Sequence, residues 1–293
     1  MKIAIGQAYN GLHRKYKKHI AAAGAKTFLF DIDKARWMDR IKKEKPDAIF
    51  WHADSKEERY YIVTDRIYFI ENFLNLPVFP DMNMYSTYGD KIKQNDIFKL
   101  HDIPTPKTFV TFKKDEALTF AKNTKYPFIL KHPYGYGGWH VFKIDNLTQA
   151  KKFIEEIFSK KGHYVKYSTL KNIFYVQEFL KVEKDLRVIV IGGKTFCAYW
   201  RQGQSGDWRH NVGQGGGVHF EGVPKKALTM CEKITKKLNF HWMSYDLFIM
   251  PNGEIKLVEF SCNFGFKGGE AHGYDVRKAI GEYVVKYLKK KVK

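Results

Sequence analysis

Lys131 has the setting of a phosphate-binding residue. It ends the apolar segment 126–131 and comes directly before the glycine-rich segment 133–138. A lysine at a rigid strand end, beside backbone N–H groups, is suited to hold phosphate oxygens. The glycines of this segment, which would let it close over the phosphates as a mobile lid, are Gly135, Gly137 and Gly138. A solvated lysine at the end of an ordinary strand is the alternative interpretation.

The segment that begins at residue 176 has groups that suit the rest of a nucleotide. It contains, in order, Gln177, Glu178, Phe179, Asp185 and Arg187. We expect an edge segment here, whose backbone groups meet an adenine while a carboxylate lies near the ribose hydroxyls. An ordinary strand and turn would account for the same residues.

Further basic and amide side chains follow on polar, glycine-rich sequence. They are Arg201, Arg209, His210 and Asn211, and residues 215–217 are all glycine. Two arginines and an asparagine without an evident role in a core suit the negative charge of a polyphosphate. A flexible surface loop is the alternative.

Two carboxylates lie inside apolar strands. Asp246 belongs to the run 245–250 and Glu259 to the run 254–260. Unpaired carboxylates at the edge of a core destabilise the fold unless they bind a cation or pair with basic groups. Magnesium fits, because it takes carboxylates together with phosphate oxygens. A structural ion pair with a nearby lysine or arginine is the alternative.

Turn and cap residues predict the elements that carry these side chains. Two hairpins are expected, one joining 185–191 to 195–201 through a Gly-Gly-Lys turn, the other joining 245–250 to 254–260 through Pro-Asn-Gly. Asp90 is the expected N-cap of a helix over 90–101, and Asn146 opens an amphipathic helix. Strands on hairpins with helices between them favour an α+β fold.

The chain divides into three parts. Short apolar strands at 2–6, 27–30 and 48–51 alternate with helical segments, which indicates a small α/β domain over residues 1–88. Two prolines in 103–106 mark a linker. We expect one subdomain with the glycine-rich lid over 89–175 and a second, with the metal and phosphate site, over 176–293.

The composition excludes several classes of protein. The 293 residues are 44% hydrophobic and 28% charged, which excludes wholesale disorder. No apolar run approaches the roughly 20 residues of a membrane helix. The three cysteines form no CxxC pair, so we expect a reducing cytoplasm and no zinc knuckle. The formal net charge of +20 indicates an anionic partner, unless it is only a bias of composition.

The order of these motifs resembles the ATP-grasp superfamily, specifically the RimK-like carboxylate–amine ligases, over residues 85–290. The resemblance implies an α/β N-terminal domain followed by an α+β ATP-grasp fold of two subdomains. It also implies roles for particular residues: Lys91 and Lys131 on the ATP phosphates, Gln177, Glu178 and Phe179 at the adenine, Asp185 at the ribose, Arg209, His210 and Asn211 at the phosphates and metal, and Asp246 and Glu259 as ligands of Mg²⁺, with Mn²⁺ as the alternative ion.

One position departs from the family's pattern. The family's metal motif is Glu-x-Asn, whereas here Glu259 is followed at the amide position by Ser261, with Asn263 two residues further on. Either Ser261 or Asn263 supplies the oxygen, or one magnesium ion is held weakly. A degenerate, inactive site is the alternative.

The resemblance implies that ATP phosphorylates a carboxylate, that an amine attacks the acyl phosphate, and that ADP and phosphate leave as an amide forms. Arg201 is our candidate for stabilising the acyl phosphate. A nucleotide-binding protein without ligase activity and an ATP-dependent kinase are the competing hypotheses. The positive charge favours an acidic peptide or protein tail as acceptor, with an amino acid as second substrate. We expect no membrane and no nucleic acid as partner, and the sequence does not fix the oligomeric state.

Overall fold

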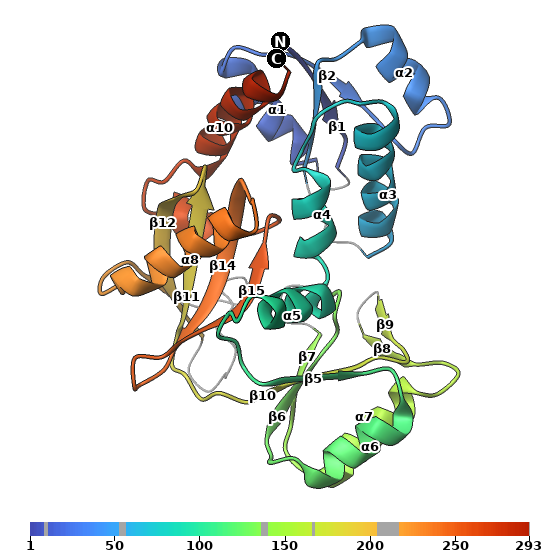
Figure 1. Cartoon of the computed structure of the whole chain (residues 1–293), viewed down its shortest axis with the longest axis vertical. Helices are drawn as coiled ribbons and strands as arrows, with labels where there is room; N and C mark the ends of the chain where they lie inside the picture. Colours follow the sequence, from blue (N-terminus) through green and yellow to red (C-terminus); the bar gives the residue numbers. More distant parts are fainter. Residues whose placement is uncertain (9–10, 53–56, 136–139, 166–167, 204–216, 293) are drawn as a thin grey trace.

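The computed structural model describes residues 1–8, 11–52, 57–135, 140–165, 168–203 and 217–292. Three sheets follow one another along the molecule, with the five-stranded sheet in the middle (Figure 1). The predicted α/β region followed by an α+β fold is confirmed. Within the described residues, no helix is both long and apolar enough to cross a membrane.

The N-terminal sheet is parallel and has the strand order β2-β1-β3-β4. Its strands are β1 (Lys2–Gly6), β2 (Lys26–Phe30), β3 (Ala48–Trp51) and β4 (Val78–Phe79). The helices that follow them are α1 (His13–Ala22), α2 (Trp37–Glu44), α3 (Glu57–Phe73) and α4 (Met82–Tyr88). The predicted strands 2–6, 27–30 and 48–51 are confirmed, and all four residues of β3 are buried.

The second sheet is antiparallel, with the order β5-β10-β6-β7. Its strands are β5 (Thr108–Thr111), β6 (Phe128–Lys131), β7 (Val141–Ile144) and β10 (Phe174–Glu178). The helices α6 (Lys114–Asn123) and α7 (Leu147–Ile157) and the small hairpin of β8 (His163–Val165) and β9 (Ser168–Leu170) accompany it, whereas α5 (Lys91–Leu100) packs against α4 and β15 (Ile255–Ser261). This second sheet has a hydrophobic core of its own. Strand β10 spans the expected boundary at 175/176, and the whole strand belongs to this sheet.

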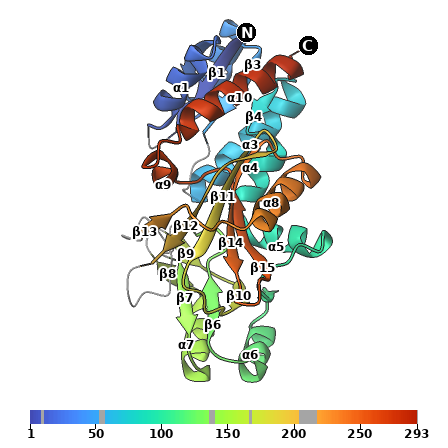
Figure 2. The same cartoon turned by 90° about the vertical axis from the view of Figure 1, so that its left-hand side faces the viewer.

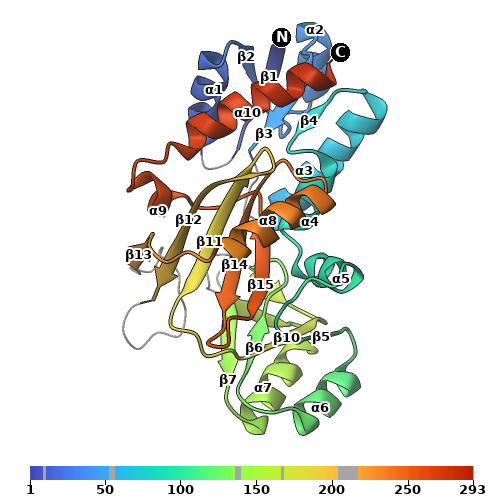
Figure 3. The same ribbon diagram turned by 60° about the vertical axis from the view of Figure 1, so that its left-hand side comes forward.

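The third sheet has the order β13-β12-β11-β14-β15, and both predicted hairpins are confirmed. Its strands are β11 (Asp185–Ile191), β12 (Lys194–Gln202), β13 (Gly217–His219), β14 (Trp242–Ile249) and β15 (Ile255–Ser261). Helix α8 (Lys225–Lys237) packs on one face of it (Figure 3).

The C-terminal end of the chain returns to the N-terminal sheet. After the short α9 (Lys267–Glu270), α10 (Val276–Lys291) lies along α1, so the two chain ends are close together (Figure 2). One hydrophobic core contains residues of the N-terminal and the five-stranded sheet. The part over residues 1–88 is therefore packed continuously onto the C-terminal part.

Candidate active site

A row of charged side chains crosses the face of the five-stranded sheet opposite α8. The hydroxyl of Tyr245 lies 2.6 Å from that of Thr235 on α8, so the next residue, Asp246, points to the other face. In register across the strands, Arg201 is paired with Asp185, Arg187 with Asp246, and Asp246 with Glu259. Directly paired residues share a face, so four neighbouring strands bring these side chains together.

Two arginines hold two carboxylates at the centre of this row. Arg201 donates from Nε and Nη2 to Asp185 at 2.6 Å, and its Nη2 also lies 2.8 Å from Oδ2 of Asp246. Arg187 donates to both oxygens of Asp246 at 2.8 Å. Burial would raise the pKa of Asp246, but Arg187 and Arg201 outweigh it and hold that pKa well below its usual range. Asp246 therefore carries its negative charge at neutral pH.

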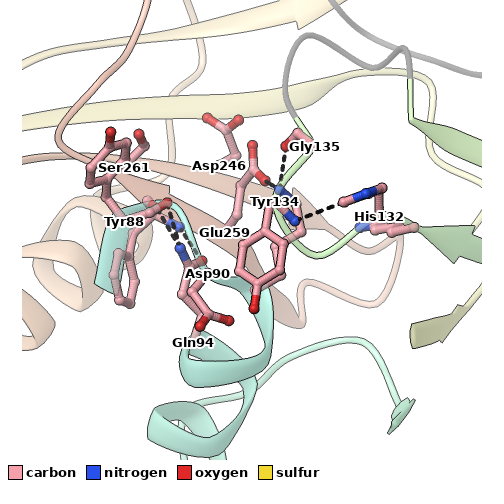
Figure 4. A network of polar contacts seen from close by, with 12 residues as sticks. Tyr88, Asp90, Gln94, His132, Tyr134, Gly135, Asp246, Glu259 and Ser261 are labelled. Carbon is pink, nitrogen blue, oxygen red and sulfur yellow. Dashed lines mark hydrogen bonds and ion pairs between the residues drawn. The ribbon is translucent and has the colours of Figure 1, made fainter. Parts of the chain in front are cut away.

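Glu259 is the more open carboxylate of the row. A β-bulge lies between the Asp246–Glu259 pair and the Leu247–Leu257 pair, and bulges of this kind change the direction of side chains. Its side chain is 36% exposed, and Oε2 lies 3.5 Å from Nζ of Lys91, beyond the usual 2.7–3.2 Å of a hydrogen bond. Glu259 therefore retains lone pairs for a cation. Figure 4 shows it between Asp246 and the Tyr134–Gly135 segment.

Lys91 joins this carboxylate to the glycine-rich segment. Asp90 caps α5 as predicted, accepting hydrogen bonds from the N–H groups of Ile92 and Lys93, which fixes Lys91 at the first helical position. Nζ of Lys91 donates to the carbonyl oxygen of Gly135 at 2.7 Å. One lysine thus contacts both the beginning of the expected lid and the expected metal ligand.

Lys131 ends strand β6 inside the site, as predicted. Its Nζ donates to Oε1 of Gln177. Burial lowers the pKa of Lys131 to about 8, which the carboxylates of Glu259 and Asp246 partly counteract and Lys91 reinforces. A buried ammonium group beside Lys91 favours a polyanion, since phosphate charge would compensate both cations.

The beginning of the glycine-rich segment is rigid and closely packed. His132 has a pKa lowered to about 4 by burial, so the ring is neutral; Nδ1 accepts from the N–H of Tyr134, and Nε2 lies 2.9 Å from the Ser168 hydroxyl. A Cβ on Gly135 would lie 2.6 Å from that of His140, so this position requires glycine. Gly137 and Gly138 lie outside the described residues.

The expected adenine-binding segment differs from the prediction in one respect. Strand β10 lies between β5 and β6 and is not an edge strand, because both of its sides are already hydrogen-bonded. The carboxylate of Glu178 accepts from the N–H of Lys107 at 2.9 Å and from Nζ of Lys256 at 3.0 Å. The ring of Phe179 lies 5.4 Å from Nζ of Lys143. Backbone groups for an adenine would therefore come from the residues after β10.

Asp185 and Ser261 have protein partners that the sequence did not reveal. Both oxygens of Asp185 accept from Arg201, so the carboxylate expected at the ribose is part of the buried row. The Ser261 hydroxyl accepts from the N–H of Asn263 at 3.0 Å and donates to its carbonyl oxygen at 2.8 Å. Ser261 therefore shapes the turn after β15.

The oxygen groups of this site suit magnesium. In the described part of the chain, no three His, Cys, Asp or Glu side chains meet as a complete metal site. Magnesium needs only one or two carboxylates, because it retains waters and binds substrate phosphates. Glu259, which pairs with Lys91 only at 3.5 Å, and Asp246, held in its ionised form, meet that requirement.

Two residues have roles in this site that the sequence did not predict. Arg187 positions Asp246, and its alternation with Asp185 along one strand was the available signal. Gln94 donates to the carbonyl oxygens of Thr87, Tyr88 and Phe260 and accepts from the N–H of Phe260, which fixes α5 to β15. Three further expected residues, Arg209, His210 and Asn211, lie outside the described residues.

The chain is similar in sequence to known proteins. The family model of the RimK-like ATP-grasp domain matches residues 88–284. The alpha-aminoadipate–LysW ligase LysX of Saccharolobus solfataricus is 30% identical over 183 residues, which cover 61% of this chain and 63% of that protein. A probable alpha-L-glutamate ligase of Halorhodospira halophila is 24% identical over 97% of this chain and 95% of that protein.

Two solved structures share the fold. The RimK domain ATP-grasp protein of Sphaerobacter thermophilus superposes with a TM-score of 0.70 at 17% identity, covering 97% of this chain and all of that one. The D-alanine–D-alanine ligase of Bacillus anthracis gives a TM-score of 0.68 at 13% identity, with 99% of each chain covered. These likenesses extend over the N-terminal sheet as well as the two that follow it.

Proposed function

Because the chain belongs to the family of RimK-like ATP-grasp domains, we propose that it is an ATP-dependent carboxylate–amine ligase that releases ADP and phosphate. The observation that carries the proposal is the row across the sheet, in which Asp246 and Glu259 lie side by side facing Lys91 and Lys131. Carboxylates for a metal and lysines for phosphates thus meet at one place. The proteins named above as relatives are ligases.

In this proposal Lys131 and Lys91 bind the phosphates of ATP, and Asp246 and Glu259 hold Mg²⁺. The metal would neutralise phosphate charge during transfer. The reaction needs little proton transfer from the protein, because positioning and charge neutralisation suffice. Phosphoryl transfer from ATP to a carboxylate forms an acyl phosphate, and an amine then displaces phosphate to form the amide.

Arg201 has a more restricted role than its sequence suggested. Its side chain is 6% exposed, and Nε and Nη2 contact Asp185 and Asp246. We assign its Nη1 edge to the acyl phosphate. Arg209 and Asn211 are assigned to phosphates and metal, His210, Gly137 and Gly138 to the nucleotide, Asp185 to the ribose side, and Ser261 or Asn263 to the metal, all on the family resemblance.

We assign an acidic peptide or protein as acceptor and an amino acid, glutamate first, as amine substrate. By their names, the relative from Saccharolobus solfataricus acts on LysW and the relative from Halorhodospira halophila acts on glutamate. Helix α1 contains no acidic residue, and α8 contains five lysines with one acid, Glu232, which pairs with Lys194. We also place the reaction in the cytoplasm, since Cys197, Cys231 and Cys262 are buried as free thiols.

The test is ADP release in the presence of ATP, Mg²⁺, single amino acids and acidic peptides, with mass spectrometry of the product. A ligase gives a product with the summed mass of both substrates less one water. A product heavier by one phosphoryl group would indicate a kinase. Nucleotide binding without ADP release under any combination would indicate a binding protein.

A further inference from the structure

The strand order of the N-terminal sheet reverses at one place. From the central strand β1, the chain passes to β2 on one side and then to β3 on the other, and all these strands are parallel. In open parallel sheets, ligands bind outside the carboxyl ends of the strands where the order reverses. Here that place is the end of β1 and β3.

His52 lies at this place, and within the described residues its ring has no hydrogen-bond partner. It directly follows β3, is 2% exposed, and neither ring nitrogen has a hydrogen bond. Burial lowers the pKa of His52 to about 4, so at neutral pH the ring is uncharged, with one N–H donor and one acceptor. Buried polar groups are nearly always hydrogen-bonded, so an unpartnered imidazole indicates a group that the protein alone does not supply.

The neighbours of His52 suit an anion. Its ring stacks on Tyr16 with centroids 5.0 Å apart, and Arg277 at the start of α10 is close enough to act on it electrostatically. Arg277 pairs with Glu270 through Nη1, while its buried Nε has no hydrogen bond. Helix α1, which follows β1, has no side-chain cap and no acid in its first turn. Its positive end adds to the field of Arg277.

One segment of chain connects the row of charged side chains with Arg277. Arg187, which holds Asp246, also donates from Nη1 to the carbonyl oxygen of Gly265 at 3.2 Å. The chain then continues through α9 with Glu270 to Arg277.

We propose that His52 and Arg277 bind the carboxylate of the amino-acid substrate of the ligase, the neutral ring donating one hydrogen bond and the guanidinium the other. This proposal rests on the proposed function, and it gives the N-terminal domain a direct part in substrate choice. A planar carboxylate has two oxygens to accept from two donors of this kind.

The test compares two substrates in two proteins. His52→Phe retains the stacked ring and removes both nitrogens. Glutamate and γ-aminobutyrate, which is glutamate without its α-carboxylate, are used as amine substrates. In the wild type, loss of that carboxylate should raise KM about tenfold or more, as expected for a charge-assisted contact. In His52→Phe, KM for glutamate should rise by a similar factor. KM for γ-aminobutyrate should then differ little from KM for glutamate, and KM for ATP should not change.

Arg277→Gln should behave like His52→Phe, and His101→Phe, at the end of α5, is the matched control. Thermal melting without substrate verifies folding. Unchanged KM for glutamate in His52→Phe, or equal penalties for γ-aminobutyrate in both proteins, would overturn the proposal. If the wild type turns over neither substrate, the proposed ligase function is wrong, and calorimetric titration with glutamate tests the site separately. Binding to the wild type but not to His52→Phe would support the site. Absence of binding to the wild type would overturn it.

Discussion

Arg187 and Asp246 lie opposite each other on β11 and β14, and the guanidinium donates one hydrogen bond of 2.8 Å to each carboxylate oxygen. Their side chains are 14% and 9% exposed. The proposed metal ligand Asp246 is thereby ionised and oriented by the protein itself. The same contact means that Asp246, a residue of the proposed catalytic site, also contributes to the stability of the fold.

Arg187→Met should destabilise the protein by about 3–5 kcal/mol, because it leaves a buried carboxylate without its main partner. The pKa of Asp246 is lower in the folded state than in the unfolded state, where it is about 3.9. Its ion pairs therefore stabilise the fold fully above about pH 3.9, and this stabilisation is lost as the pH falls through the pKa of the folded state. The difference in the free energy of unfolding between wild type and variant, measured with urea, should therefore become smaller in acid.

Lys114→Met is the control for Arg187→Met. It removes an ion pair with Glu155 whose side chains are 44% and 58% exposed, and it should change stability by less than about 1 kcal/mol. Equal stability of Arg187→Met and wild type at pH 7 would show that the buried pair contributes nothing.

Lys131→Met should bind ATP about tenfold to a hundredfold more weakly, through loss of a charge-assisted contact to phosphate. The ligand-free variant should nevertheless melt at a higher temperature, because burial lowers the pKa of Lys131 to about 8 and its charge destabilises the fold. Between about pH 8 and the unfolded pKa of about 10.4, folding releases a proton from this lysine. As the pH rises through this range, the melting temperature of the wild type should therefore approach that of the variant.

Calorimetry with ATP and thermal melting at pH 7 and pH 10 measure these two effects. Lys125→Met replaces an exposed lysine just before the same strand and should change neither. If Lys131→Met lowers the melting temperature at pH 7, the charged lysine does not destabilise the ligand-free protein.

Local signals predicted most of the elements that carry the site. The turn glycines gave both hairpins, and Asp90 gave α5, because caps and turns depend on residues within a few positions. Helix α3 was missed, since apolar residues occur all around it and it shows little periodicity. The Arg187–Asp246 pair spans 59 residues of sequence, and the register between two hairpins is set by packing of the whole sheet.

Glu259→Gln and Asp246→Asn should both abolish turnover, but only the second should harm folding. Asp246 is buried between two arginines, whereas the side chain of Glu259 is 36% exposed. Without nucleotide, Glu259→Gln should melt like the wild type, and Asp246→Asn several degrees lower. Normal ATP turnover by Glu259→Gln would refute the metal assignment.

Asn263→Ala should raise the magnesium concentration needed for half-maximal activity, whereas Ser261→Asn should be neutral or harmful. The Ser261 hydroxyl is hydrogen-bonded to both backbone groups of Asn263, so an amide at 261 would disturb the turn after β15. A magnesium titration of ADP release measures this. A lowered magnesium requirement in Ser261→Asn would instead assign the amide position to residue 261.

Use of the acidic acceptor should depend strongly on salt. The net charge of +20 produces a long-range field that raises the encounter rate of anionic partners, and salt screens it beyond about 10 Å at roughly 0.1 M. The second-order rate constant for the acceptor should fall markedly over about a tenfold rise in salt. Replacing the exposed lysines Lys225, Lys226, Lys233 and Lys236 of α8 by glutamine should reduce this dependence and leave the rate with a neutral peptide unchanged. A rate constant that does not vary with salt in the wild type would show that the basic surface does not recruit the acceptor.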